Sequence, residues 1–271
     1  LDHYNNLANP GVFIDEAISS FDTRVGKPDG DGPQQIATNK RFGEASVFFD
    51  ISKQQYISYV EPLSITSASV DVSYDVWINM SDFNTPSPMF SWGDGTGNNY
   101  VEFVIETDGS LRYLIYQGGV EQTNEVTPAG LIVQDTWHHI ALGRISGDST
   151  IYIDGQAQIS TLVSLPVTNL TSLQCGANLA SGKNDYFSGY MDEERTTFLA
   201  TEFVGDFSPP SIAYDVSSPA VVSDDGTLIP LIGSGGAGTT GTGSTVIWNK
   251  INEDVSRSIG NVIVGKTSPT T

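Results

Sequence analysis

Residues 131–155 read LIVQDTWHHIALGRISGDSTIYIDG, and this stretch decides the fold. Apolar and polar side chains alternate over about 137–145 and again over 149–154, which is the period of half-buried strands. Ser146-Gly147-Asp148 separates the two runs, and glycine and aspartate tolerate the positive φ of a tight hairpin. Asp154-Gly155 then gives a second turn. The stretch predicts a β-hairpin followed by another reversal of the chain.

Three segments resemble one known family in order and spacing. WHHIA at 137–141 with IYIDG at 151–155 is similar to the WHHVA and LYVDG hairpin of laminin-G-like and concanavalin-A-like jelly rolls. FGEASVFFD at 42–50 resembles the family's opening strand, FGGSLYFDG, and FSGYMDEER at 187–195 resembles its closing strand, FNGYIDEVR. The resemblance covers about residues 40–200 and implies an all-β, antiparallel two-sheet sandwich. It implies little about function, because this sandwich hosts lectins, adhesins, enzymes and structural proteins.

The longest alternation in the chain runs from residue 70 to residue 80. It places Val72, Tyr74, Val76 and Ile78 on one face, which we expect to line the core with Ile151 and Ile153. The other face is polar apart from Trp77. Further strands are expected at about 47–49, 56–60, 100–106, 111–116, 173–177 and 186–198. Residues 117–130 and the stretch from 156 through Pro166 read as loops.

Composition changes at both ends of the predicted sandwich. Residues 1–39 are polar, broken by prolines, and predict an extended arm. Residues 40–205 form the predicted sandwich. Residues 206–271 contain a Gly/Thr-rich run and only short apolar strands, at about 227–232, 245–248 and 260–264. A core this small is marginal alone, so we expect both end segments to make contacts within an assembly, with other copies of the chain or with other proteins.

The charge balance excludes several partners. The chain has 12 Lys and Arg against 32 Asp and Glu, a net charge of −20. Such a surface repels phosphate backbones, so we expect no nucleic-acid binding. No run of about 18 apolar residues is present, so we expect no membrane insertion. Cys175 is the only cysteine, which rules out an intrachain disulfide and suggests a small buried hydrophobe.

No cofactor is required by the sequence, but two groups of oxygen ligands could hold a structural calcium ion. Asp50 and Asp192 fall in the opening and closing strands of the resemblance, where they could meet. Asp94, Asn98 and Asn99 lie in a Gly-rich loop. The alternatives are local hydrogen bonding for the closing-strand acid and an ordinary strand connection for the loop.

Trp77 and Trp92 are candidates for stacking against sugars if their rings are exposed, and core positions are the alternative. His138 and His139 are adjacent on a strand, so their side chains point to opposite faces and are expected to pack rather than share a metal. No residue is assigned a catalytic role. The Glu-x-Asp-x-(x)-Glu arrangement of one glycosidase family on this fold, the Gly-x-Ser-x-Gly motif and a Cys/His pair with a clear orienting acid are all absent.

Two non-enzymatic functions remain. A polar arm, a Gly/Thr-rich tail and a single cysteine suit a virion structural or adhesion protein, such as a phage capsid-decorating, fibre or tail component that attaches to host-surface glycans. The alternative is a carbohydrate-binding module of a secreted bacterial polysaccharide-degrading or adhesion protein. We expect the first, located in the virion and forming a homo-oligomer.

Overall fold

The computed structural model describes residues 25–26, 32–59, 71–162, 172–178, 181–198, 201–213, 220–222 and 228–230. The chain divides into two compact units, residues 1–15 with 21–213 and residues 16–20 with 214–271. In the second unit, β15 (Ala220–Val222) and β16 (Leu228–Pro230) form a small antiparallel hairpin. β16 matches the first strand expected in that region. The strands expected at 245–248 and 260–264 lie outside the described residues, as does most of the expected arm.

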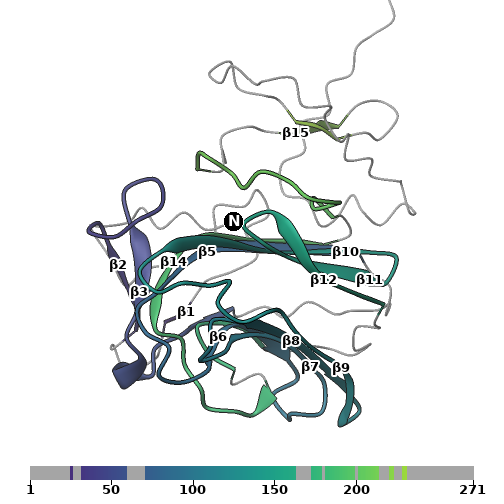
Figure 1. The fold of residues 1–271 in the computed structure, drawn as a ribbon, viewed down its shortest axis with the longest axis horizontal. Helices are drawn as coiled ribbons and strands as arrows, with labels where there is room; N and C mark the ends of the chain where they lie inside the picture. Colours follow the sequence, from purple (N-terminus) through teal and green to yellow (C-terminus); the bar gives the residue numbers. More distant parts are fainter. Residues whose placement is uncertain are drawn as a thin grey trace, which may run out of the picture. The chain divides into compact units, whose positions relative to one another are not determined.

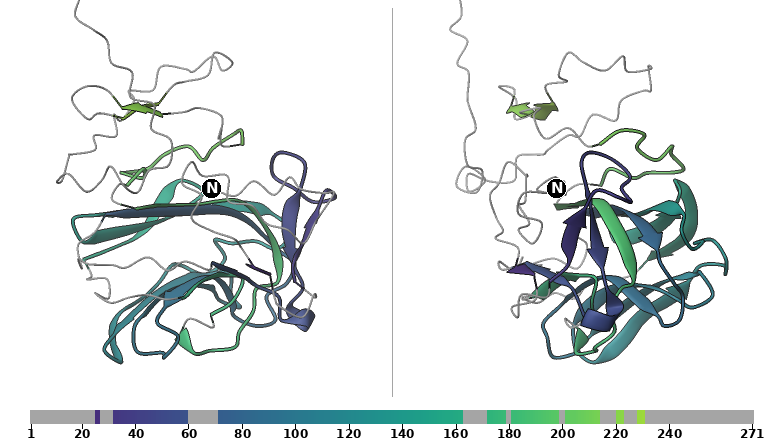
Figure 2. Two further views of the ribbon diagram at one scale, coloured as in Figure 1. Left: turned by 180° about the vertical axis from the view of Figure 1, so that it is seen from behind. Right: turned by 90° about the vertical axis from the view of Figure 1, so that its left-hand side faces the viewer.

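The first unit contains two antiparallel seven-stranded sheets that lie as stacked layers (Figures 1 and 2). In spatial order, the first sheet consists of β12 (Gln156–Leu162), β11 (Asp148–Ile153), β10 (Trp137–Ile145), β5 (Val72–Met80), β14 (Gly189–Phe198), β3 (Ser46–Phe49) and β2 (Gln34–Ile36). The second sheet consists of β1 (Val25–Gly26), β4 (Ile57–Tyr59), β13 (Ser172–Cys175), β6 (Ser87–Gly93), β7 (Tyr100–Ile105), β8 (Leu111–Gln117) and β9 (Val120–Val126). A 3-10 turn, η1 (Ile51–Lys53), follows β3. The predicted all-β sandwich is confirmed.

The predicted hairpin is β10 and β11. Ile140 pairs with Ile153 and Ile145 pairs with Asp148, so the strands reverse through Ser146-Gly147. The second predicted turn is also present, since Asp154 and Gly155 both have positive φ, 51° and 77°. β10 also pairs with β5 along eight residues, which places the hairpin beside the central strand of the first sheet.

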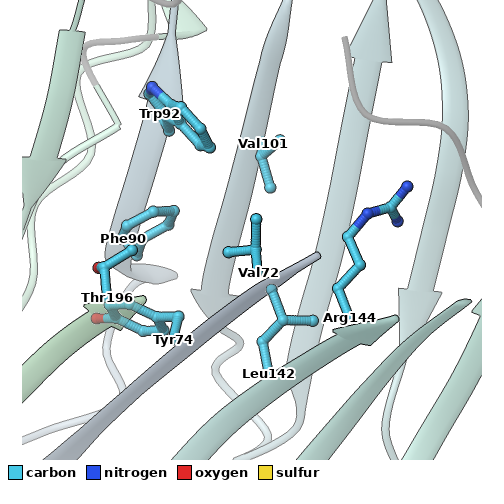
Figure 3. Close-up of a pocket in the computed structure, with 8 residues that line it drawn as sticks. All are labelled: Val72, Tyr74, Phe90, Trp92, Val101, Leu142, Arg144 and Thr196. Atoms are coloured by element: carbon cyan, nitrogen blue, oxygen red, sulfur yellow. The ribbon is translucent and has the colours of Figure 1, made fainter. Parts of the chain in front are cut away.

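The core lies between the two sheets and contains the predicted residues. Val72, Tyr74, Val76, Ile78, Ile151 and Ile153 are all at most 5% exposed and belong to one apolar cluster. A small cavity of about 20 Å³, room for about one water molecule, remains beside the buried Arg144 (Figure 3). Arg144 donates to Gly147 O at 3.0 Å and to Ser149 Oγ at 2.8 Å, so its charge is hydrogen-bonded inside the sandwich.

Two expectations from the sequence were wrong. β9 and β12 lie where loops were expected, because VEQTNEV and QAQISTL lack the apolar alternation that identifies a strand. The polar face of β5 is not solvated, since all nine residues of β5 are buried. Segments that are distant in the sequence cover that outer face.

One of these segments, residues 201–213, lies along the outer side of the first sheet (Figure 1, the green segment above β14 and β10). Phe203 and Phe207 pack against Tyr152 and against each other, with ring centres 4.8 Å apart in the latter pair. Gly143 and Gly155 allow this approach, because an added Cβ would lie 2.2 Å from Phe203 O and 2.0 Å from Phe207 O. Residues 201–213 thus belong to the sandwich unit, and we call them the covering segment.

Candidate functional site

The outer face of the second sheet carries a pair of stacked tyrosines. Alternation turns Val101, Phe103 and Ile105 into the core, so Tyr100 and Glu102 point outward. Tyr100 pairs with Tyr116 of β8, and their rings stack with centres 4.8 Å apart and planes 10° apart. Tyr100 is buried, whereas Tyr116 is half-buried. Burial raises the pKa of the Tyr100 hydroxyl, so both hydroxyls are neutral at physiological pH.

A buried carboxylate fixes the loop that borders this pair. Glu102 is fully buried and accepts hydrogen bonds from Ser181 Oγ and, at 2.8 Å, from Lys183 Nζ. The Lys183 side chain is 37% exposed, and its ammonium lies 5.3 Å from the centre of the Tyr100 ring. The pairing satisfies a charge that would be costly to bury alone, and it holds the ammonium beside the tyrosines.

Polar side chains continue the surface toward β9. Glu121 pairs with Tyr116, and its Oε2 accepts from Tyr116 Oη at 3.3 Å and from Asn124 Nδ2 at 3.4 Å. Arg112 of β8 donates from Nε to Glu106 Oε1 at 2.5 Å. We call Tyr100, Tyr116, Arg112, Glu121, Asn124 and Lys183 the tyrosine surface. It combines an aromatic ring with donors and acceptors that water can reach.

The predicted calcium loop lies at one end of this surface, and the side-chain oxygens of Asp94 and Asn99 accept hydrogen bonds there. Asp94 Oδ1 accepts from the N–H and hydroxyl of Thr96, and Asp94 Oδ2 accepts from Asn99 Nδ2 at 2.8 Å. Asn99 Oδ1 accepts from Gly118 N, and the carbonyl of Asn98 accepts from Gly119 N. Partial burial works to raise the pKa of Asp94, but these hydrogen bonds outweigh it and hold the pKa below its ordinary value. Hydrogen bonds within the loop and to Gly118 and Gly119 therefore fix its conformation, which is the ordinary strand connection that the sequence left open.

The second proposed pair of calcium ligands is separated by the strand register. Phe49 pairs with Gly189 and Val47 with Met191, so Asp50 and Asp192 lie beyond opposite ends of this pairing, roughly 13 Å apart along the strands. Asp50 caps η1 by accepting from Ser52 N. The expectation that the two carboxylates meet was therefore wrong. No cluster of three or more His, Cys, Asp or Glu suited to a metal occurs within the described ranges.

The Asp192 carboxyl binds the backbone of residues 41 and 42. Its Oδ2 accepts from the backbone N–H groups of Arg41 and Phe42 at 2.9 and 3.0 Å, and its Oδ1 accepts from Glu193 N. Burial raises the pKa of Asp192 to about 7, although these three donors work in the opposite direction. The carboxyl therefore fastens residues 39–44 to the first sheet.

Neither predicted tryptophan offers a ring face to solvent. Trp92 is 4% exposed and lies in the inter-sheet core. Trp77 is also 4% exposed, on the outer face of the first sheet, where the Arg41 guanidinium lies 4.1 Å from its ring centre. Phe42 meets the same ring edge-on at 5.8 Å. Both rings are therefore buried, which is the alternative that the sequence left open for each.

The two histidines point to opposite faces, as alternation predicts. His138 Nε2 accepts from Val133 N, so Nδ1 carries the proton and donates to Asp154 Oδ2 at 2.7 Å. Burial works to raise the pKa of Asp154, but hydrogen bonds from His138 and from the His139 N–H outweigh it and lower the pKa. His139 is paired with Asp75 on the outer face of the sheet. Both histidines hold strands together.

The sequence contains one signal for the tyrosine surface, which is the alternation of residues 100–105. Once Val101 and Phe103 are assigned inward, Tyr100 and Glu102 must face outward. The pairing of Tyr100 with Tyr116, and the return of residues 181–183 over Glu102, depend on tertiary structure. They could not be derived from local alternation.

Fold and site together define an all-β sandwich with one covered outer face and one outer face that carries a partly exposed aromatic and polar surface. The chain belongs to the concanavalin A-like lectin/glucanases superfamily, whose Laminin G-like profile matches residues 52–196. No curated protein matches the sequence significantly. No helix within the described ranges is long and apolar enough to cross a bilayer.

Several solved structures are similar to this chain at low sequence identity. Domain 4 of the extracellular arabinanase AbnA from Geobacillus stearothermophilus, in complex with arabinotriose, is 17% identical, with a TM-score of 0.55 over 78% of this chain and 94% of that chain. The CBM40 domain of the Ruminococcus gnavus IT-sialidase is 13% identical, with a TM-score of 0.44 over 52% and 91%. Tailspike protein 2 of Escherichia coli O157:H7 bacteriophage CAB120 is 15% identical, with a TM-score of 0.46 over 63% of this chain and 25% of that chain.

Proposed function

We propose that this chain is a non-catalytic carbohydrate-binding domain and that the tyrosine surface holds the glycan. The stacked Tyr100–Tyr116 pair, bordered by hydrogen-bonding side chains, is the observation that carries the proposal. A pyranose or furanose has apolar C–H faces and polar edges, so it suits an aromatic ring surrounded by carboxylate, amide and guanidinium groups. The arabinanase domain of the same fold is in complex with arabinotriose, which supports a sugar ligand.

The absence of catalysis is part of this proposal. Glycoside hydrolysis needs two carboxyl groups that flank the scissile bond, one of them free to donate a proton. Of the acids in and beside the tyrosine surface, Glu102 is fully buried under Lys183 and Ser181, Glu106 is held by Arg112, and Glu121 accepts from Tyr116 and Asn124. We therefore expect bound oligosaccharides to be released unchanged, which chromatography of the ligand after prolonged incubation would check.

A glycan array probed with the full chain tests the binding function. We expect retention on a limited set of glycans, and loss of that retention in Asn124→Ala and Glu121→Gln, both exposed changes that leave the core intact. Glu125→Ala is a matched control, because Glu125 is also an exposed acid on β9 but belongs to the row of residues that faces inward. If the wild-type chain binds no glycan on the array, the proposal is rejected.

For the biological setting we propose a virion attachment role, in which the chain contacts copies of itself or other virion proteins and binds cell-surface glycans. The sequence outside residues 40–205, with its broken arm and Gly/Thr-rich tail, supports assembly. The alternative is a module of a secreted bacterial protein, which the likeness to a domain of an extracellular arabinanase favours. Fixed stoichiometry of the chain in purified particles would support the virion role. Its presence only in culture medium, joined to a hydrolase, would support the alternative.

A further inference from the structure

Three buried polar atoms on the outer face of the first sheet have no hydrogen-bond partner within the described structure. They are Trp77 Nε1, Asn79 Oδ1 and His139 Nδ1, and their residues are 4%, 3% and 0% exposed. Leaving such groups unsatisfied costs about 1–3 kcal/mol each, so several together on one face call for an explanation.

The three side chains are neighbours. His139 stands directly opposite Trp77 in the β10–β5 pairing, and their rings lie 5.1 Å apart. Asn79 is two residues from Trp77 on the same face of β5, roughly 7 Å away along the strand. His139 Nε2 faces the Asp75 carboxylate and carries the proton, so Nδ1 is an acceptor. The group thus offers one donor, from Trp77, and two acceptors.

Two segments close this face. The covering segment lies over His139, whose ring centre is 6.2 Å from that of Phe203 and 5.8 Å from that of Phe207, and residues 39–44 lie over Trp77. Residues 39–44 have no regular secondary structure, and none of their side chains is fully buried. They are held by the two N–H bonds to Asp192, by the Trp77–Arg41 contact and by Trp137 Nε1 donating to Asn39 Oδ1 at 3.2 Å. The exposed Arg41 and half-buried Phe42 are the groups that contact the Trp77 ring.

We propose that Trp77, Asn79 and His139 form a second, covered binding site that takes a neutral sugar when residues 39–44 and the covering segment move aside. A hydroxyl both donates and accepts, so two hydroxyls on one sugar satisfy the Trp77 donor and both acceptors, while the uncovered indole supplies the stacking face. The Asp75 carboxylate on the same face is already paired with Arg195, so a ligand that offers neutral hydroxyls suits the site. This site is separate from the tyrosine surface and does not depend on it.

The double variant Arg41→Ala, Phe42→Ala in the full chain tests the site, since it removes the side chains that cover Trp77 and keeps the backbone donors to Asp192. We expect stronger acrylamide quenching of tryptophan fluorescence, with the increase absent when Trp77→Phe is added. We also expect about tenfold tighter binding of one of a panel of neutral oligosaccharides of glucose, galactose, mannose, N-acetylglucosamine and arabinose. The gain should survive Tyr116→Ala and disappear with Asn79→Ala.

Each outcome is decisive. If quenching does not change, residues 39–44 do not cover Trp77, and the proposal fails. If quenching rises but no oligosaccharide binds more tightly than to wild type, the three atoms are satisfied by water alone, and the proposal also fails. Should the double variant not fold, Arg41→Ala alone replaces it, because that side chain is exposed. Loss of the gain with Tyr116→Ala would assign the binding to the tyrosine surface instead.

Discussion

His139 donates from Nε2 to Asp75 Oδ2 across β10 and β5, over 3.1 Å, with both side chains at most 1% exposed. Arg195 of β14 donates from Nε to the other oxygen, Asp75 Oδ1, at 2.9 Å. One carboxylate therefore joins three adjacent strands of the first sheet on a face that the sequence marks as polar.

We predict that Asp75→Ala destabilises the sandwich by about 3–5 kcal/mol, because it leaves His139 and Arg195 without the carboxylate that joins them. Chemical denaturation of the full chain measures this. Glu125→Ala removes an exposed carboxylate and should change the free energy of unfolding by no more than about 0.5 kcal/mol. Equal effects of the two variants would show that the Asp75 network does not stabilise the fold.

Gly143→Ala should dislodge the covering segment. Its φ is not positive, so alanine is tolerated by the backbone, but the new Cβ would lie 2.2 Å from Phe203 O. We expect a destabilisation of about 1–3 kcal/mol and faster proteolysis within residues 201–213. Gly130→Ala is a control for backbone strain, since Gly130 has a φ of 77° and an open space around it. Unchanged proteolysis in Gly143→Ala would contradict the observed packing.

Asp192 makes stability depend on pH. Its pKa is raised by burial to about 7, so the native state keeps this proton after the unfolded chain has lost it. Stability from this group is therefore fully present below pH of about 4 and declines as the pH rises to about 7, by up to about 1.4 kcal/mol per pH unit. Asp192→Asn should remove that part of the slope. Identical pH profiles for the two proteins, measured by denaturant midpoint, would show that Asp192 titrates normally.

Calcium removal should have no effect on the melting temperature. Both oxygens of Asp94 already accept hydrogen bonds from Thr96 and Asn99, and Asp50 and Asp192 do not meet. An ion that binds only the native state would raise the melting temperature by mass action. Thermal melts with excess chelator and with millimolar calcium check this. A melting temperature several degrees higher with calcium would contradict the prediction and show that the native chain binds the ion.

The sequence predicted the elements whose alternation is strong and failed where contacts are distant. The β10–β11 hairpin and the core face of β5 follow from local patterns, since Ile151, Ile153 and Val76 recur at period two. β9 and β12 were missed because polar edge strands carry no such pattern. Trp77 is covered by Arg41, 36 residues earlier, and His139 is covered by Phe203 and Phe207, more than 60 residues later. No local window contains that information.

The central claim is that the tyrosine surface binds carbohydrate, and the most direct measurement compares two tyrosine variants by calorimetric titration with the best glycan from the array. Tyr116→Ala should weaken binding by about tenfold or more, since it removes the partly exposed ring of the stacked pair. Tyr190→Ala, a half-buried tyrosine on the first sheet that contacts Phe48, should leave the dissociation constant unchanged. Equal affinity of wild type and Tyr116→Ala, with both folded, would contradict the account.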